Sequence, residues 1–130
     1  MGKNVMVVDD CRTTRKIVSL YLNNAGYKTI GAGNGVEAIE KLVSSEVDII
    51  ISDLNMPQMD GAGLVEWVRS NPSYREIPFI ILTTENDVLR KSDLIQKGAS
   101  AFLSKPITKE NLVEEVTRIL ERCNYVRFQD

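Results

Sequence analysis

Short apolar runs, rich in β-branched residues, recur along the chain with little polar alternation inside them. They lie at residues 5–8, 27–32, 47–51, 77–82 and 101–103, and the run at 27–32 is the weakest because glycine interrupts it. A strand with one solvent-facing side would alternate polar and apolar residues. Continuous runs of this kind therefore predict strands that are buried on both faces of a sheet.

A helical pattern of apolar residues follows each run. The predicted helices cover residues 13–25, 35–44, 62–70, 87–97 and 109–122. Gly26 and Gly98 directly follow two of these segments, where glycine commonly ends a helix. Five strand–helix units in alternation predict an α/β fold, namely a five-stranded parallel sheet that is doubly wound, with five helices covering its two faces.

The length, net charge and hydropathy of the chain limit the classes of protein to which it can belong. A length of 130 residues suits a single domain over residues 1–130, with 123–130 expected to be a helix extension or a tail in which Tyr125 and Phe128 pack. The net charge of −2 offers no general attraction to nucleic acid or anionic lipid. No apolar stretch is long enough to insert into a membrane and no secretory signal precedes the first run, so we expect a cytoplasmic protein.

The chain contains no histidine. This excludes histidine-based nucleophilic triads, histidine-ligated zinc and a role as a phosphohistidine carrier. If phosphate reaches this protein from a histidine, that histidine must belong to a partner.

The two cysteines, Cys11 and Cys123, form no CxxC pair and fit a reducing compartment. Both are expected to be plain thiols, buried or half-buried. Cys11 follows two aspartates, which would disfavour its thiolate.

Polar residues follow four of the predicted strands at the point where each strand ends. They are Asp9 and Asp10, Asp53, Thr83 and Lys105. Each alone is more often a turn residue or a helix cap. In open parallel sheets, however, ligands bind outside the carboxyl ends of the strands, so four such coincidences predict one shared pocket.

Three carboxylates in one pocket need a cation. Two unit charges about 4 Å apart repel by roughly 4 kcal/mol at an effective dielectric near 20. With few protein oxygens and no calcium-loop motif, the set suits Mg²⁺, which keeps waters and shares its shell with phosphate. A pocket that adds Lys105 and Thr83 is suited to a phosphoryl group, with Asp53 as the nucleophile on the inferred central strand. Because no nucleotide-binding glycine motif is present, the phosphate must arrive activated on a donor.

The segments VMVVDD, IIISDLNMPQMDG, FIILTT and AFLSKP carry a specific resemblance. Over residues 3–122, which form the expected core, the chain resembles the receiver domain of bacterial two-component response regulators, of the single-domain CheY-like type. The resemblance implies a five-stranded sheet in the order 2-1-3-4-5.

The resemblance also implies residue roles around the phosphate. Asp53 matches the phosphoacceptor, and Asp9 and Asp10 match the acidic pair that holds Mg²⁺, with Asp10 the direct ligand and Asp9 acting mainly through water. The backbone carbonyl of Asn55 matches the third protein ligand of the metal. Lys105 matches the lysine that pairs with phosphoryl oxygens, and its bond to the following proline is cis in the family.

Further matches concern switching and phosphate lifetime. Thr83 matches the switch hydroxyl, and Phe102 matches the switch aromatic, a position that is often tyrosine. Asn55, Thr84 and Glu85 occupy positions that tune dephosphorylation, and Thr84 is larger than the alanine or glycine often found there.

The function implied is signalling rather than turnover of a released substrate, so no enzyme activity is expected beyond self-phosphorylation and self-dephosphorylation. A sensor histidine kinase or its phosphotransfer domain would donate the phosphate. The predicted output surface comprises residues 87–97, 101–104 and 109–122, marked by Lys91, Lys97 and Phe102. The downstream target would be a flagellar switch in chemotaxis or, alternatively, a relay phosphotransferase.

Two readings from other classes stay open. An aspartyl-phosphate phosphatase of the haloacid dehalogenase kind would carry a DxD motif, which Asp53-Leu54-Asn55 breaks. A pseudo-receiver would bind partners without phosphate, but the complete set of pocket residues argues against it.

Overall fold

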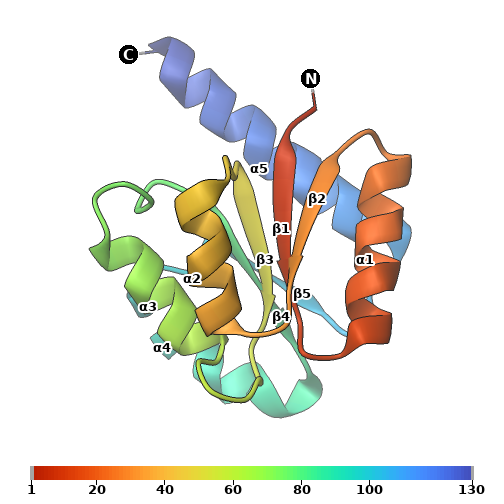
Figure 1. The fold of residues 1–130 in the computed structure, drawn as a ribbon, viewed down its shortest axis with the longest axis vertical. Coiled ribbons are helices and arrows are strands. Elements are labelled where there is room, and N and C mark those ends of the chain that lie inside the picture. The colour runs from red at the N-terminus through yellow and green to blue at the C-terminus, as the bar shows by residue number, and fades with distance from the viewer. Residues whose placement is uncertain (1, 130) are drawn as a thin grey trace.

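A computed structural model describes residues 2–129, with side chains described up to residue 122. The chain alternates strands and helices as predicted (Figure 1). The strands are β1 (Asn4–Val8), β2 (Lys28–Ala32), β3 (Ile49–Asp53), β4 (Phe79–Thr83) and β5 (Ala101–Ser104). The helices are α1 (Arg12–Asn24), α2 (Gly35–Ser44), α3 (Gly61–Ser70), the 3₁₀ helix η1 (Glu85–Arg90), α4 (Lys91–Lys97) and α5 (Lys109–Gln129).

All five strands are parallel and lie in the order β2-β1-β3-β4-β5, which confirms the predicted fold. The register pairs Val8 with Ser52 and pairs Asp53 with Leu82. The central strands β1, β3 and β4 therefore end at nearly the same level. Their carboxyl ends form one edge of the sheet, where the next residues of each strand meet.

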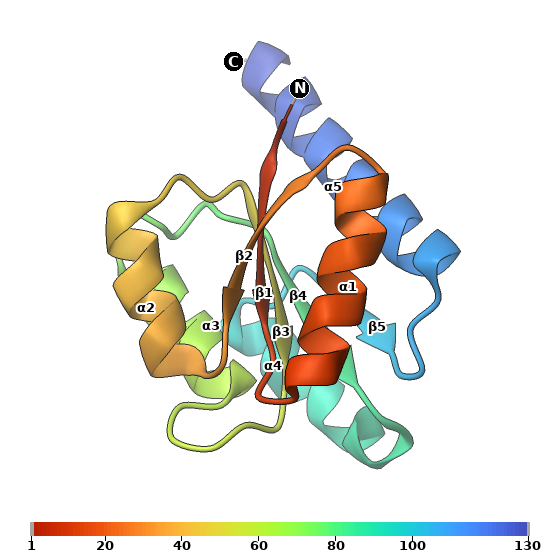
Figure 2. The same cartoon turned by 45° about the vertical axis from the view of Figure 1, so that its right-hand side comes forward.

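Each face of the sheet carries its own hydrophobic core. Alternate strand residues such as Met6, Ile50 and Ile81 pack against α2, α3 and α4. The intervening residues, such as Val7 and Ile51, pack against α1 and α5. Figure 2 shows α2 and α3 on one side of the strands and α1 and α5 on the other. The period of two in a strand thus divides one apolar run between two cores.

The central strands are buried on both faces, as their apolar runs predicted. The same prediction was wrong for β5, whose residues are half-buried or exposed, and for β2, in which only Ala32 is buried. The reason is their position, because β2 and β5 are the two edge strands of the sheet. An edge strand has a neighbour on only one side.

The segment predicted as one helix over 87–97 is a 3₁₀ helix, η1, followed by the short helix α4. The predicted apolar face is also wrong, since Leu89 is 95% exposed and only Leu94 of the apolar residues is buried. Asp87 is the other buried residue of this segment, and its carboxylate accepts a hydrogen bond from the backbone N–H of Thr84, the residue before η1. This segment is consequently held to the sheet by few apolar contacts.

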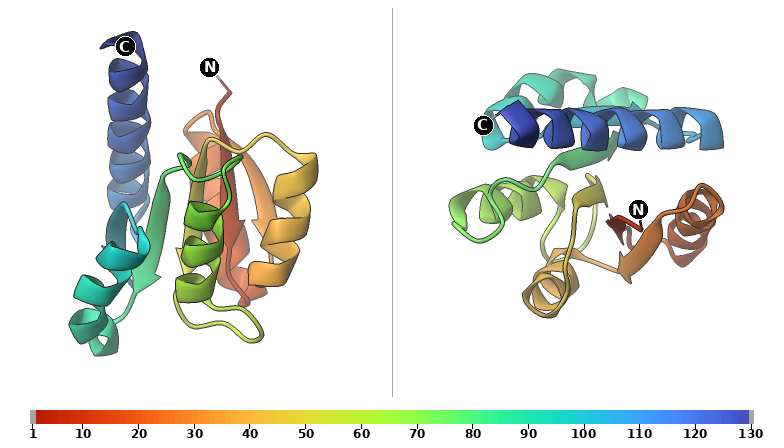
Figure 3. Two further views of the ribbon diagram at one scale, coloured as in Figure 1. Left: turned by 90° about the vertical axis from the view of Figure 1, so that its left-hand side faces the viewer. Right: turned by 90° about the horizontal axis from the view of Figure 1, so that it is seen from above.

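Helix α5 continues to Gln129, so the backbone favours the helix extension over the loose tail. Figure 3 shows α5 running beyond the end of the sheet. The expectation that Tyr125 and Phe128 pack lies outside the described side chains. Within residues 2–129, no helix has both the length and the apolar character needed to cross a lipid bilayer.

Candidate functional site

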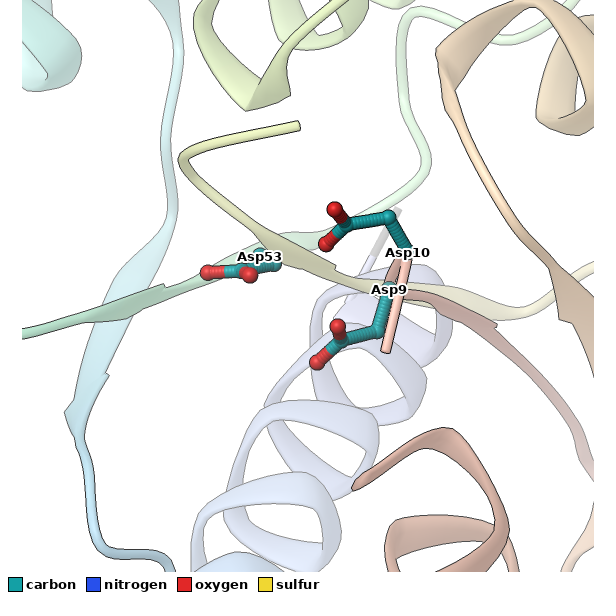
Figure 4. A group of neighbouring side chains, drawn as sticks. All are labelled: Asp9, Asp10 and Asp53. Atoms are coloured by element: carbon teal, nitrogen blue, oxygen red, sulfur yellow. The ribbon is translucent and has the colours of Figure 1, made fainter. Parts of the chain in front are cut away.

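Three carboxylates meet at the carboxyl edge of the sheet. Asp9 and Asp10 follow β1, and Asp53 is the last residue of β3. One oxygen from each lies within 4.8 Å of the others. Figure 4 shows the three side chains pointing toward the same side. Asp9 and Asp53 are buried whereas Asp10 is exposed, so the cluster is closed on the side of Asp9 and Asp53 and has an open rim, accessible to solvent, at Asp10.

Asp9 is the most constrained of the three acids. Its Oδ1 accepts a hydrogen bond from the backbone N–H of Cys11 at 2.9 Å. Its Oδ2 is buried and has no hydrogen-bond partner in the described part of the chain. Burial raises the pKa of Asp9, and the nearby carboxylates of Asp53 and Asp10 raise it further, while the Cys11 hydrogen bond and Lys105 oppose this.

Lys105 supplies the positive charge beside these acids. Its Nζ lies 3.1 Å from Oδ2 of Asp53 and 3.9 Å from Oδ2 of Asp9. The lysine follows β5, and its backbone N–H donates to the carbonyl of Thr83 at 2.8 Å. The Lys105–Pro106 bond is cis, as the resemblance implied. One ammonium faces three carboxylates, so the cluster keeps an excess of negative charge when all are ionised.

The residues present fit a hard divalent cation. The donor set consists of oxygens, and the unpartnered Oδ2 of Asp9 lacks the hydrogen bond that a buried carboxylate oxygen normally makes. A cation would offset both the repulsion among the acids and the cost of burying Asp9.

Thr83 ends β4 beside this cluster. Its hydroxyl is buried and Oγ1 finds no hydrogen-bond partner within the described residues. Buried hydroxyls without partners are uncommon in folded proteins. This hydroxyl is therefore available to an acceptor that enters the pocket.

Asp87 was missed by the sequence reasoning. Its carboxylate accepts hydrogen bonds from the Thr84 backbone N–H at 2.8 Å and from the Thr84 hydroxyl at 3.0 Å. The Thr84 N–H is the main reason that the pKa of Asp87 is lowered, and the Asn55 side chain contributes as well. The T-x-x-D spacing of Thr84 and Asp87 resembles a capping box, and that signal could have placed the start of the helical segment at 85.

The remaining predicted residues lie farther out. Asn55, Thr84 and Glu85 are exposed. Phe102 is half-buried, and Lys91 Nζ lies 5.5 Å from the centre of its ring, within reach of a cation–π contact.

Lys97 turns away from this group. Its Nζ lies 3.1 Å from Asp93 and 3.7 Å from Glu66 of α3, and the Asp93 carboxylate raises the pKa of the lysine. Lys91 and Phe102 therefore mark one patch, to which Lys97 is less directly connected.

Cys11 corrects an expectation. The thiol is exposed rather than buried, because Cys11 stands at the N-cap of α1 outside the sheet. Hydrogen bonds from Thr14 lower its pKa, and the Asp9 carboxylate opposes this only weakly. The aspartates before Cys11 thus do not dominate its ionisation.

Comparison with known proteins agrees with this geometry. A family model described as the response regulator receiver domain matches residues 5–117. The chain is 37% identical over 118 residues to chemotaxis protein CheY1 of Helicobacter pylori, covering 89% of this chain and 95% of that protein.

Two solved structures are also similar to this chain. Chemotaxis response regulator CheY4 of Vibrio cholerae superposes with a TM-score of 0.86 at 37% identity, covering 92% of this chain and 99% of that one. A signal receiver domain of a histidine kinase from Syntrophus aciditrophicus gives 0.83 at 35% identity, covering 92% and 90%. The chain belongs to the response regulator receiver domain family of two-component signalling.

Proposed function

We propose that Asp53 accepts a phosphoryl group from a phosphohistidine on a sensor histidine kinase or its phosphotransfer domain. The observation that carries this proposal is the Lys105 ammonium 3.1 Å from the Asp53 carboxylate, beside the unpartnered buried oxygen of Asp9. A buried carboxylate paired with one cation, in a pocket open on one side, can act as a nucleophile. Its position at the end of the central strand makes it reachable from the open rim.

The transfer balances as a displacement at phosphorus. An Oδ atom of Asp53 forms the new P–O bond as the P–N bond to the donor imidazole breaks, and the imidazole nitrogen keeps the electron pair and takes a proton. Lys105 holds a phosphoryl oxygen by its charge. Asp9, Asp10, Asp53 and the backbone carbonyl of Asn55 would hold Mg²⁺, which would supply charge neutralisation at the phosphoryl oxygens. Phosphate is lost when a water oxygen forms a new bond to phosphorus and the bond from phosphorus to the Asp53 oxygen breaks, which restores the carboxylate and releases inorganic phosphate.

The phosphate becomes a signal through the segment after β4. Phosphorylation adds acceptor oxygens beside the unpartnered hydroxyl of Thr83, which gains a hydrogen bond by moving toward them. Thr83 leads directly into η1 and α4, where Val88, Leu89 and Ile95 are exposed and contribute little to anchoring. Such a weakly held segment is suited to a change of position.

A partner recognises the output surface formed by residues 87–97, 101–104 and 109–122, where Phe102 changes its exposure. A downstream protein, the flagellar switch in chemotaxis, binds this surface in the cytoplasm. A single-domain phosphorelay intermediate is the alternative, since it uses the same Asp53 chemistry and differs only in passing the phosphate to a relay phosphotransferase. In a dehalogenase-type phosphatase, position 55 would be the acid–base aspartate, whereas here it is an exposed asparagine.

A phosphate mimic tests the proposal. With Mg²⁺ and beryllofluoride, the backbone amide signals of η1, α4 and β5 should shift in ¹H–¹⁵N spectra, because Thr83 and the segment after it respond to the new acceptor. The Asp53→Asn variant, which keeps the size of the side chain, should show no such shifts. Changes confined to the loops around Asp53 would count against the proposed output surface.

The lifetime of the phosphate should depend on Thr84. We expect Thr84→Ala to lose phosphate roughly three- to tenfold faster, which corresponds to about 1 kcal/mol, because a smaller side chain leaves more room for the attacking water. The decay of the phosphorylated protein measures this directly.

Thr84→Ser is the matched control. Serine keeps the hydroxyl that donates to Asp87 and removes only the methyl group. If crowding by the methyl sets the lifetime, serine and alanine both shorten it. An unchanged or slower decay in Thr84→Ala would refute the idea.

A further inference from the structure

A second charged pocket lies at the amino ends of β4 and β5, opposite the carboxylate cluster. In Figure 1 this is the end where α3 passes into β4 and where α5 runs past the sheet. Four arginines line it, Arg69, Arg75, Arg118 and Arg122, and Glu76 is the one carboxylate among its lining residues. Glu115 pairs with Arg118 from outside the lining, so four positive and two negative charges leave a local excess of two, in a chain whose net charge is −2.

Arg69 is the central residue of this arginine pocket. It is half-buried, and its guanidinium donates to the backbone carbonyls of Gly98 at 3.0 Å, Ile77 at 2.6 Å and Arg75 at 3.1 Å. A weaker contact of 3.3 Å reaches the hydroxyl of Ser100. All four acceptors are neutral. Within the described residues, no carboxylate lies within 4.0 Å of Arg69, as one normally does for a cation withdrawn from water.

The surroundings of Arg69 disfavour the charged form of its guanidinium. Burial lowers the pKa of its guanidinium, with only Glu76 acting in the opposite sense. Carbonyl dipoles satisfy the donors of the guanidinium but do not cancel its charge. An anion in the pocket would supply the missing counter-charge.

Two of the neighbouring arginines pair with carboxylates, one with the exposed Glu76 and the other with the half-buried Glu115. Arg75 lies 3.9 Å from Glu76, and Arg118 pairs with Glu115 one turn away on α5. An exposed pair such as Arg75–Glu76 contributes about 0.2–1 kcal/mol, so an incoming anion can compete for Arg75. The Arg118 side chain is itself exposed and can be reached by an anion from solvent. Planar guanidinium groups match the oxygens of a phosphate in pairs, which a lysine cluster would not do.

We propose that this arginine pocket binds a small phosphate anion carrying at least two negative charges. The pocket is concave and the positive charge is local, whereas the molecule as a whole is negative, which favours a small anion over a nucleic acid. The site is separate from Asp53, and its occupation does not require the proposed function.

Pyrophosphate titrated in EDTA tests this proposal, because EDTA keeps divalent metal out of the carboxylate cluster. We expect saturable shifts of the Ile77 and Ser100 amides below about 10 mM pyrophosphate, and no comparable shifts at Asp10. Arg118→Gln should weaken binding roughly fivefold or more, since a bidentate partner is lost. The side chain is exposed, so its loss should leave the fold intact.

Arg12→Gln is the matched control, because Arg12 is an exposed arginine on α1, outside this pocket. It changes the net charge equally and should leave pyrophosphate binding unchanged. Three results would overturn the proposal: no saturable shift at Ile77 and Ser100, shifts that appear mainly around Asp10, or equal weakening in Arg12→Gln and Arg118→Gln.

Discussion

Gly61→Ala should destabilise the protein by about 2–3 kcal/mol, the size expected for forcing an extra group into a packed site. Gly61 is the first residue of α3 and is buried against the end of β3. A Cβ there would lie 2.5 Å from the carbonyl oxygen of Asp53 and 3.0 Å from Cα of Leu54. Both are backbone atoms, so neither can turn aside as a side chain would. The helix would have to move away from the strand that carries Asp53, and urea unfolding followed by circular dichroism measures the cost.

Gly63→Ala provides the control two residues along the same helix. A Cβ at Gly63 would meet the side chain of Met59 at 3.2 Å, and Met59 can adjust because its side chain is flexible. Alanine is also favoured over glycine inside a helix by about 1 kcal/mol. Gly63→Ala should therefore lie within about 1 kcal/mol of the wild type. Equal stability of the two variants would show that close backbone approach at Gly61 does not limit this fold.

Asp9→Asn should stabilise the metal-free protein by on the order of 1–2 kcal/mol at neutral pH, because it removes a buried charge with an unpartnered oxygen. Burial raises the pKa of Asp9 in the folded protein, so the fold favours the protonated acid. The resulting stability is present below the unfolded pKa and is lost as the pH rises through the folded pKa. Asparagine stays uncharged at every pH and can still accept the hydrogen bond from Cys11.

Mg²⁺ should reduce the stability advantage of Asp9→Asn over the wild type. Mg²⁺ should raise the free energy of unfolding of the wild type more than that of Asp9→Asn, since the variant lacks one of the acids that would hold the ion. Asp10→Asn is the matched control, because Asp10 belongs to the same cluster but is exposed. It should gain less stability in EDTA than Asp9→Asn. Unfolding curves in EDTA and in Mg²⁺ give both comparisons, and an Asp9→Asn variant less stable than wild type in EDTA would contradict the account.

The sequence predicted the parts of the structure that depend on general rules. Buried parallel strands need continuous apolar runs, so β1, β3 and β4 were recognisable from these runs in the sequence. Their carboxyl ends must share one edge, so Asp9, Asp53 and Lys105 could be placed together before any geometry was known.

The features that the sequence did not predict depend on strand order and on local hydrogen bonds at the ends of helices. The exposure of β5 follows from its place at the edge of the sheet, and an apolar run carries no information on strand order. The start of the helical segment at Glu85 follows from the hydrogen bonds between Thr84 and Asp87, which the apolar periodicity does not reveal. Cys11 is exposed because α1 begins directly after it.

Phosphorylation of Asp53 is the central claim, and acetyl phosphate tests it without a partner kinase. The wild-type chain incubated with acetyl phosphate and Mg²⁺ should gain the mass of one phosphoryl group, and peptide mapping after borohydride reduction should place it on Asp53. Asp53→Asn should gain no mass, and EDTA should suppress the gain in the wild type. No mass gain in the wild type, or an equal gain in Asp53→Asn, would contradict the account.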